Sequence, residues 1–276
     1  MKNILAIHDI SCVGRCSLTV ALPIISAFGS TCVSLPTALL STHTGGFTGF
    51  TCLDLTDEMR KIVQAWQPLH LKFDAVYSGF LASHEQIDLV KDIISAYKTQ
   101  KMVAVIDPVM ADDGKLYSIF DATFVEKMKE LIPFADVLVP NLTEAMLLTG
   151  RAYFDGPYTP AFIQELIGDL KRFGAKNVVL TGVFYDNEEL GAAVSSQSDG
   201  GITTCMRPRI AGSYHGTGDI FGSILTAELM NGKTLFDAAA AAVDFVVASI
   251  NATPKEADKK YGVDFESALY SAQRKA

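Results

Sequence analysis

Residues 102–106 read Met-Val-Ala-Val-Ile, and they lead into Asp107-Pro108-Val109-Met110-Ala111-Asp112-Asp113, an amphipathic stretch at Thr123–Ile132 and a second apolar run at Val137–Val139. Short unbroken apolar runs are typical of strands that are buried on both faces of a parallel sheet. The amphipathic stretch between the two runs fits the crossover helix that parallel strands require. This unit therefore predicts an α/β fold built on a parallel sheet.

The same alternation of apolar and amphipathic stretches extends from the N-terminus to about residue 181. Four more strands are expected, at Ile4–His8, Thr31–Leu35, Ala75–Ser78 and Asn177–Thr181. Five more helices are expected, at Cys16–Phe28, Leu55–Gln67, His84–Lys98, Leu142–Leu148 and Pro160–Phe173. Gly29 and Gly174 stand where a helix end favours a left-handed residue, and Asn141 and Thr159 are expected N-caps. The alternation predicts helices on both faces of the sheet.

The pattern changes after Thr181. Gly191–Ser196 and Ile202–Met206 are expected to form an antiparallel pair joined by the turn Ser198-Asp199-Gly200-Gly201. Three helices are expected to follow, at Thr217–Met230, Leu235–Asn251 and Asp264–Arg274. The sequence contains no internal repeat or convincing linker, so it predicts a single domain over residues 1–276, with a mainly parallel central sheet and antiparallel strands in the C-terminal half.

Composition narrows the class of protein. The chain is 49% hydrophobic and 20% charged, which excludes intrinsic disorder, and its net charge of −8 argues against a nucleic-acid polymer or an anionic membrane as partner. No apolar run reaches the roughly 20 residues of a membrane-spanning helix, and the short N-terminal run resembles a first strand rather than a signal peptide. Five scattered cysteines fit a reduced, cytoplasmic protein. An acidic α/β chain of this kind is most often a metabolic enzyme.

One glycine-rich stretch, Gly212-Ser213-Tyr214-His215-Gly216-Thr217-Gly218-Asp219, runs straight into an expected helix. Its glycines allow a ligand to approach the backbone, and the first amides of a helix are unpaired donors at the positive end of the helix dipole. These features predict an anion site that suits a phosphate, with Asp219 close enough to accept a proton from a hydroxyl group. The same pattern also fits a plain capped helix start.

Two acidic segments follow expected strands that are successive in the sequence. Asp107, Asp112 and Asp113 come after the strand at residues 102–106, and Glu144 lies in the Pro140-Asn141-Leu142-Thr143-Glu144 segment after the next one. Carboxylates at strand ends can bind a hard cation such as the Mg²⁺ that accompanies a nucleotide. An ordinary acidic turn explains the first segment equally well, and a helix capping box explains the second.

Other patterns are weaker. His43 lies in the polar loop Ser41–Phe47, where a single histidine is more often a hydrogen-bonded structural residue than a ligand. Cys12 and Cys16 lack the second pair that a zinc site needs. The chain contains neither a Walker P-loop nor a Gly-x-Gly-x-x-Gly turn after its first strand, and no ordering of Ser, His and Asp suggests an acyl-transfer triad.

Taken together and in this order, Asp107-Pro108-Val109-Met110, Pro140-Asn141-x-x-Glu144 and Gly216-Thr217-Gly218-Asp219 resemble the ribokinase-like superfamily, specifically its vitamin-kinase branch. The resemblance covers nearly the whole chain. The loop from Leu40 to Thr44 is similar to the substrate loop of pyridoxal kinases, and residues 15–23 are similar to the first helix of bacterial pyridoxamine kinases.

The resemblance implies a ribokinase-like three-layer α/β/α fold and a cytoplasmic enzyme of pyridoxal 5′-phosphate salvage. Its reaction would transfer a phosphoryl group from ATP to the hydroxymethyl group of a vitamin B6 vitamer, which is pyridoxal, pyridoxamine or pyridoxine. Relatives are commonly homodimers, so a homodimer is expected. The alternative activity is hydroxymethylpyrimidine kinase of thiamine biosynthesis, because that acceptor is also a hydroxymethyl heteroaromatic.

The resemblance also implies a role for each site residue. Asp219 matches the general base, and the amides of Gly216, Thr217 and Gly218 match the anion hole for the transferred group. Asp112 and Glu144 match positions that engage Mg²⁺, and Asp107 and Thr181 match positions around a monovalent cation (K⁺ or Na⁺). The remaining matches are nucleotide contacts at Asn141, Thr181, Gly182, Thr217 and Gly218, and acceptor contacts at Asp9, His43, Thr44, Phe80 and Asp219.

Three residues depart from the pyridoxal kinase pattern. Asp9 replaces a serine that contacts the substrate ring, which favours a protonated ring nitrogen or a substrate amine and so pyridoxamine. Val139 replaces a threonine near the monovalent cation, which weakens the case for potassium dependence. His215 is similar to the His-Gly-x-Gly-Cys stretch of hydroxymethylpyrimidine kinases, although those enzymes carry cysteine where this chain has Asp219.

Overall fold

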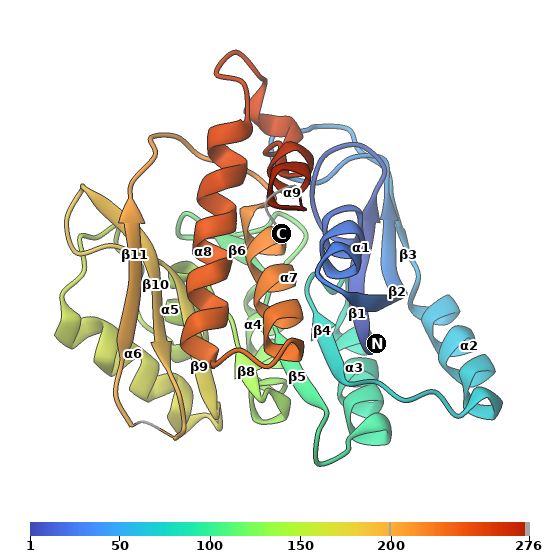
Figure 1. Cartoon of the computed structure of the whole chain (residues 1–276). Coiled ribbons are helices and arrows are strands. Elements are labelled where there is room, and N and C mark those ends of the chain that lie inside the picture. Colours follow the sequence, from blue (N-terminus) through green and yellow to red (C-terminus); the bar gives the residue numbers. More distant parts are fainter. Residues whose placement is uncertain (199, 274–276) are drawn as a thin grey trace.

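The computed structural model describes residues 1–198 and 200–273. The central strands are β1 (Lys2–Ser11), β2 (Ser30–Leu40), β3 (Cys52–Asp54), β4 (Ala75–Ser78), β5 (Val103–Ile106), β8 (Val137–Leu138), β9 (Asn177–Val183), β10 (Glu189–Ser195) and β11 (Thr203–Pro208). Within the described residues they form one nine-stranded sheet of order β11-β10-β9-β8-β5-β4-β1-β2-β3 (Figure 1). A separate hairpin joins β6 (Ala111–Asp112) to β7 (Lys115–Leu116).

The sheet is parallel in its centre and antiparallel at both edges. Strands β2, β1, β4, β5, β8 and β9 run parallel to one another, whereas β3, β10 and β11 are antiparallel additions at the edges. The expected α/β class with a mainly parallel sheet and antiparallel strands near the C-terminus is therefore confirmed. Parallel strands bring their carboxyl ends to one edge of the sheet, which is where open α/β sheets bind ligands.

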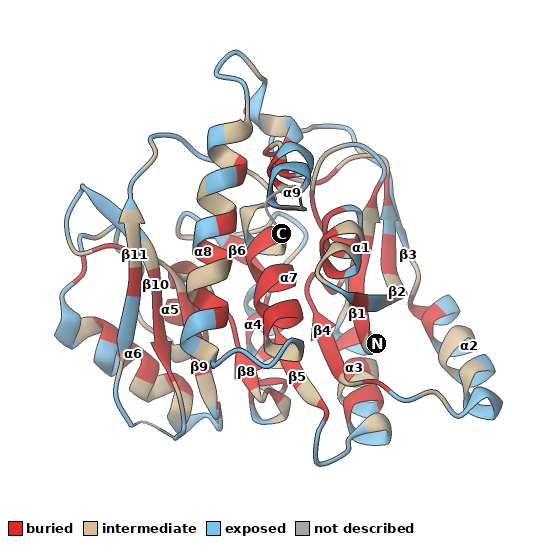
Figure 2. Ribbon diagram, viewed as in Figure 1, coloured by how far each residue is buried: buried red, intermediate tan, exposed pale blue. Residues whose placement is uncertain are grey.

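Helices cover both faces of the sheet. On one face lie α2 (Thr56–Trp66), α3 (His84–Tyr97), α4 (Ala122–Lys129), α5 (Leu142–Thr149) and α6 (Pro160–Arg172), and on the other lie α1 (Leu18–Ala27), α7 (Thr217–Met230), α8 (Leu235–Ala252) and α9 (Phe265–Gln273). Three short 3-10 segments, η1 (Gln67–Leu69), η2 (Ile132–Phe134) and η3 (Lys259–Tyr261), complete the described helical elements. Figure 2 shows exposed residues on outer helices such as α2 and α6, whereas most of α7 is buried.

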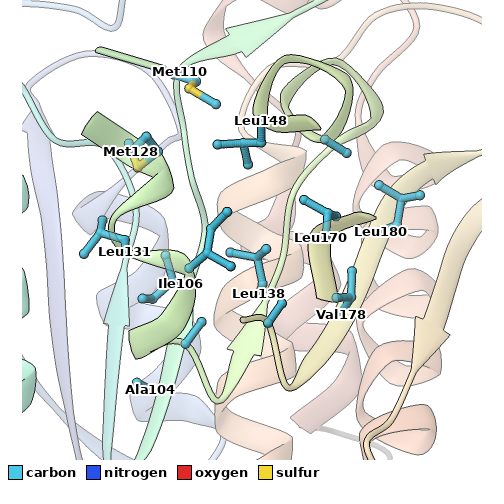
Figure 3. Packing of buried hydrophobic residues seen from close by; sticks show 14 of the residues in the cluster. Ala104, Ile106, Met110, Met128, Leu131, Leu138, Leu148, Leu170, Val178 and Leu180 are labelled. Atoms are coloured by element: carbon cyan, nitrogen blue, oxygen red, sulfur yellow. The ribbon is translucent and has the colours of Figure 1, made fainter. Parts of the chain in front are cut away.

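Two apolar cores follow from the alternation of side chains along each strand. Ala104 and Ile106 of β5 belong to the core beneath α3–α6, which Figure 3 shows at close range, whereas Val105 points to the opposite core beneath α1, α7 and α8. Both cores are built mainly from aliphatic side chains that are almost fully buried. Strands buried on both faces explain why the sequence shows unbroken apolar runs rather than alternating ones.

Helix α8 has 18 residues with a mean hydropathy of 1.5, so its length and composition alone would allow it to cross a membrane. The core helix of a globular protein meets the same criterion. In this structure α8 packs against α7, α9, β10 and β11, with Ala238, Ala242 and Phe245 in the core. One third of the helix is buried within this packing.

Most of the predicted elements are found close to their expected bounds. Strand β4 and helix α7 match the prediction at both ends, and Asn141 and Thr159 are N-caps whose side chains accept a backbone N–H bond. The short edge strand β3 and the β6–β7 hairpin were not predicted. Asp199 of the expected turn and Arg274 of the last expected helix lie outside the described residues.

Candidate active site

Two adjoining cavities open at the carboxyl edge of the parallel strands. The larger has a volume of about 360 Å³ and the smaller about 250 Å³. Their common wall contains residues from two segments that are distant in sequence: Val109, Asp112, Tyr117, His215, Gly216 and Asp219. A ligand in one cavity can therefore meet a ligand in the other at Asp219, as a reaction between two substrates requires.

The start of α7 forms the centre of this wall. Gly216 is the N-cap with φ of +79°, and a Cβ atom there would lie 1.9 Å from the carbonyl oxygen of Arg15. Only glycine fits, because the loop is pressed against the Arg15 backbone while the chain adopts a left-handed conformation. No side chain caps the first amides of α7, and Gly216, Thr217 and Gly218 line the larger cavity, so their N–H groups are available as an anion site.

Asp219 lies in the first turn of α7, and its side chain is 16% exposed. Burial raises the pKa of this carboxyl group to about 7, although the nearby backbone N–H of Ser17 partly opposes the rise. His8 Nδ1 is 3.8 Å from Asp219 Oδ1, but complete burial lowers the pKa of His8 to about 3, so the imidazole is neutral. A carboxyl group with a pKa near 7 is well matched to a general base at neutral pH.

Two buried carboxyl groups lie on the floor of the larger cavity. Glu144 accepts bonds from the N–H groups of Asn141 (2.8 Å) and Met110 (3.1 Å), and the Asn141 side chain completes a capping box at the start of α5. Burial raises the pKa of Glu144 to about 8, and burial together with the Glu144 charge raises the pKa of Asp107. The predicted capping box is therefore present, and the same glutamate is also part of the cavity.

The electrostatics of this floor favour a cation. Asp107 and Glu144 repel each other while buried, and Asp112 on the β6–β7 hairpin lines the same cavity. Oxygen donors of this kind suit Mg²⁺, which keeps waters and takes one or two carboxylates beside a nucleotide. Among the residues that the structure describes, no three His, Cys, Asp or Glu side chains are arranged to hold one metal ion by themselves. The acidic floor fits a cation that is shared with a bound polyphosphate better than a closed protein site.

The smaller cavity contains the residues that were expected to contact an acceptor. Asp9 is 4% exposed and accepts hydrogen bonds from the hydroxyl groups of Ser11 (2.9 Å) and Ser17 (2.5 Å). Burial raises the pKa of Asp9, and the two hydroxyl bonds oppose the rise. Thr44 and Phe80 line the same cavity. A buried, hydrogen-bonded carboxyl group is thus available to recognise a donor group on the ligand.

His43 is held in one orientation. The N–H of Gly45 donates to His43 Nδ1 (3.1 Å), so the proton is on Nε2, which lies 2.6 Å from the carbonyl oxygen of Lys260. The ring lies 5.2 Å from that of His215, measured between centroids, and both line the smaller cavity. Because both nitrogens of His43 are already bonded, His43 can offer a ligand its ring face.

The far end of the larger cavity is apolar and was not predicted as part of a site. Residues from α7, α8 and the β10–β11 region form this wall: Leu190, Pro208, Ile210, Phe221, Val243, Val246, Val247 and Ile250. The Arg209 side chain lies beside it, with its guanidinium 4.7 Å from the Phe184 ring centroid. A flat apolar ring such as a nucleobase suits this wall, whereas the polar end suits phosphates.

Every residue that the sequence analysis selected lines one of the two cavities. The larger one contains Asp107, Asp112, Asn141, Glu144, Thr181, Gly182, Gly216, Thr217, Gly218 and Asp219, and the smaller one contains Asp9, His43, Thr44, Phe80 and Asp219. Ser11, Ser17 and Tyr117 also line these cavities and were not predicted as site residues. Ser17 could have been noticed as a serine just before a helix, but that signal predicts only a cap.

The profile of a family described as phosphomethylpyrimidine kinase matches residues 21–264 of the chain. A hydroxymethylpyrimidine/phosphomethylpyrimidine kinase of Haemophilus influenzae is 34% identical over 184 residues, which are 63% of this chain and 63% of that protein. The chain spans less than two thirds of the length of the curated relatives it matches first.

Solved structures match over a greater length. A candidate phosphomethylpyrimidine kinase of Bacteroides thetaiotaomicron, crystallised with pyridoxal, has a TM-score of 0.94 and 38% identity and covers 99% of this chain and 96% of its own. The pyridoxal kinase of Lactobacillus plantarum has a TM-score of 0.88 and 30% identity and covers 99% of both chains. The likeness therefore includes both kinds of kinase and the whole fold.

Proposed function

The chain belongs to the phosphomethylpyrimidine kinase family, and on that premise we propose that it transfers the γ-phosphoryl group of ATP to the hydroxymethyl group of a vitamin B6 vitamer. The observation that carries the proposal is the common wall of the two cavities, where Asp219 lies beside the uncapped amides of α7. One cavity fits a nucleotide and the other a small acceptor. The group that moves would cross the wall between them.

In the proposed reaction, the hydroxyl oxygen of the acceptor attacks the γ-phosphorus and its proton passes to the carboxylate of Asp219. The bond between the γ-phosphorus and the bridging oxygen breaks, and ADP leaves. Burial of Asp219 supports this role, because it brings the pKa of the base close to neutral pH. The amides at Gly216, Thr217 and Gly218 stabilise the negative charge on the transferred group.

The nucleotide would lie along the larger cavity, with its base on the apolar wall of α8 and its phosphates near Asn141, Thr181 and Gly182. Asp107, Asp112 and Glu144 would hold Mg²⁺, directly or through water. When bound, Mg²⁺ neutralises phosphate charge. A monovalent cation near Asp107 and Thr181, a homodimer and a cytoplasmic location stay predictions from the resemblance.

Two acceptors have specific support. Aspartate at position 219, the His43–Thr44 loop and a 38% identical relative crystallised with pyridoxal support a B6 vitamer. His215, the family description and the Haemophilus relative support hydroxymethylpyrimidine equally, either as the main acceptor or as a second one. Both are heteroaromatic rings with a hydroxymethyl group, and both fit the chemistry of the proposed site.

Initial rates with Mg-ATP and each of pyridoxal, pyridoxamine, pyridoxine and hydroxymethylpyrimidine test the proposal directly. Asp219→Asn keeps the side-chain shape but removes the base, so we expect the rate to fall by at least about 100-fold while nucleotide binding is retained. Absence of turnover with all four acceptors would refute the proposed reaction. A normal rate in Asp219→Asn would refute the assignment of the base.

Asp9 gives a test of acceptor preference. Its carboxylate should favour an acceptor that carries an amine, so Asp9→Ser is expected to reduce turnover of pyridoxamine more than turnover of pyridoxal. The two acceptors differ only in the substituent at one ring position, which makes each the control for the other. Equal losses with both would show that Asp9 does not select the amine.

A further inference from the structure

Ser17 lines the smaller cavity, called the acceptor cavity from here on, and has an unusual backbone conformation. Its φ is +53° and its ψ is −135°, and the residue is 6% exposed. The other two described non-glycine residues with positive φ, His70 and Asp113, have φ of 49°, and the ψ of His70 is the ordinary left-handed 41°. The ψ of Ser17 instead resembles that of the first central residue of a type II′ turn, a position that glycine dominates. Such strain persists only when surrounding contacts hold it, and it concentrates at functional sites.

The polar groups of Ser17 are directed at two acidic side chains. Its hydroxyl donates to Asp9 Oδ1 at 2.5 Å, and its backbone N–H lies near enough to the Asp219 carboxylate to lower the pKa of that group. Asp9 comes from the end of β1 and Asp219 from the first turn of α7. One residue therefore joins the carboxylate that faces the acceptor to the proposed base.

An ordinary structural role does not account for these contacts. Ser17 is the N-cap of α1, a position where serine usually bonds to the helix amides, yet its side chain makes no capping bond. Its carbonyl oxygen accepts from Val20 and Ala21, a backbone contact that any residue could make. The serine side chain is thus diverted from the helix to the acceptor cavity.

We propose that Ser17 is a positioning residue for phosphoryl transfer, whose N–H and hydroxyl hold the carboxylates of Asp219 and Asp9 in one arrangement around the acceptor. The inference rests on the proposed function, because it takes Asp219 as the base. The hydroxyl group of Ser17 orients the carboxylate of Asp9, which recognises the acceptor. The amide of Ser17 orients the carboxylate of Asp219, which takes the proton. The strained backbone conformation of Ser17 keeps its amide directed at Asp219, and a relaxed conformation would change that direction.

Two substitutions separate these contacts. Ser17→Ala removes the hydroxyl and leaves the backbone restrained, so the acceptor KM should rise with a smaller change in kcat. Ser17→Gly also frees the backbone, so kcat should fall about tenfold below that of Ser17→Ala, with the KM for ATP within about twofold of wild type. The melting temperature of Ser17→Gly should equal or exceed that of wild type, since glycine adopts this conformation without strain.

A matched control is Ser83→Gly, the same change at the N-cap of α3, where the hydroxyl does accept from the N–H of Gln86 at 3.3 Å. Ser83 lines neither cavity, and its variant should keep wild-type kcat. A Ser17→Gly variant with wild-type kcat, or one that loses stability in step with activity, would overturn the inference. If wild type phosphorylates no acceptor, the proposed function fails and this inference with it; if only Ser17→Gly is normal, the proposed function stands.

Discussion

Replacing Gly216 by alanine should damage both the fold and the reaction. A Cβ atom at this position would lie 1.9 Å from the carbonyl oxygen of Arg15, whereas ordinary van der Waals contact begins at 3.4 Å. The loop must therefore move by roughly 1.5 Å to accept the methyl group. Because the same residue begins α7, the displacement carries the amides of the anion site with it.

The size of the effect can be worked from these two features. A left-handed conformation costs alanine roughly 1–2 kcal/mol, and a forced backbone shift adds roughly 1–2 kcal/mol. A total of about 2–4 kcal/mol would lower the melting temperature by roughly 5–15 °C for a chain of this size. A misplacement of about 1 Å in the anion site should lower kcat about 100-fold, which is about 2.7 kcal/mol of transition-state stabilisation.

Thermal unfolding and steady-state rates with Mg-ATP measure the two effects separately. Gly232→Ala is the matched control, because Gly232 also has a positive φ, of +88°, but nothing lies within 4 Å of its Cβ position and it is at the far end of α7. It should lose roughly 1–2 kcal/mol of stability and no activity. If Gly216→Ala matched Gly232→Ala in both measurements, the close approach to Arg15 would not matter and the reasoning would be refuted.

Two further predictions concern Asp219 and the apolar wall. The pKa of Asp219 in the folded protein, about 7, is above its ordinary value of 3.8, so its contribution to stability is complete below about pH 4 and is lost as the pH rises to about 7. Urea unfolding at pH 8 should therefore show a higher free energy of unfolding for Asp219→Asn than for wild type, by up to about 4 kcal/mol. This difference in free energy should shrink towards pH 4, and a difference that stayed constant with pH would contradict the prediction. Val246→Trp should fill the apolar end of the larger cavity and raise the KM for ATP at least about tenfold. If Val246→Trp left the KM for ATP unchanged, or raised the KM for the acceptor equally, the adenine base of ATP would bind somewhere other than the apolar wall.

The fold could be predicted where a strand is buried on both sides. The apolar run before Asp107 and the helix Thr217–Met230 were recognisable because burial leaves few alternatives to apolar residues. Strand β3 was missed because Cys52-Leu53-Asp54 is short and exposed at the sheet edge. The β6–β7 hairpin was missed because Ala111–Leu116 has no apolar alternation, and its pairing depends on the surrounding loops.

The site could be predicted where the chemistry is carried by residue type at a strand end or helix start. Asp107 and Glu144 are unusual residues for such buried places, Asp219 is the acidic residue in the first turn of α7, and the segments of all three stood out. The apolar wall did not, because Val246 looks the same in a sequence whether it faces a core or a cavity. Ser17 could not be assigned because its backbone conformation is imposed by tertiary contacts that no local pattern records.

The common wall of the two cavities constrains the order of events in the proposed reaction. Asp219 and Gly216 line both cavities, so the phosphoryl group can pass directly from donor to acceptor without a covalent phosphoenzyme intermediate. Such an enzyme works through a ternary complex, and its double-reciprocal plots should intersect rather than run parallel. A molecule that joins a nucleotide to a hydroxymethyl ring through a phosphate chain would occupy both cavities at once and gain the affinity of both. We therefore expect such a bisubstrate compound to inhibit the enzyme.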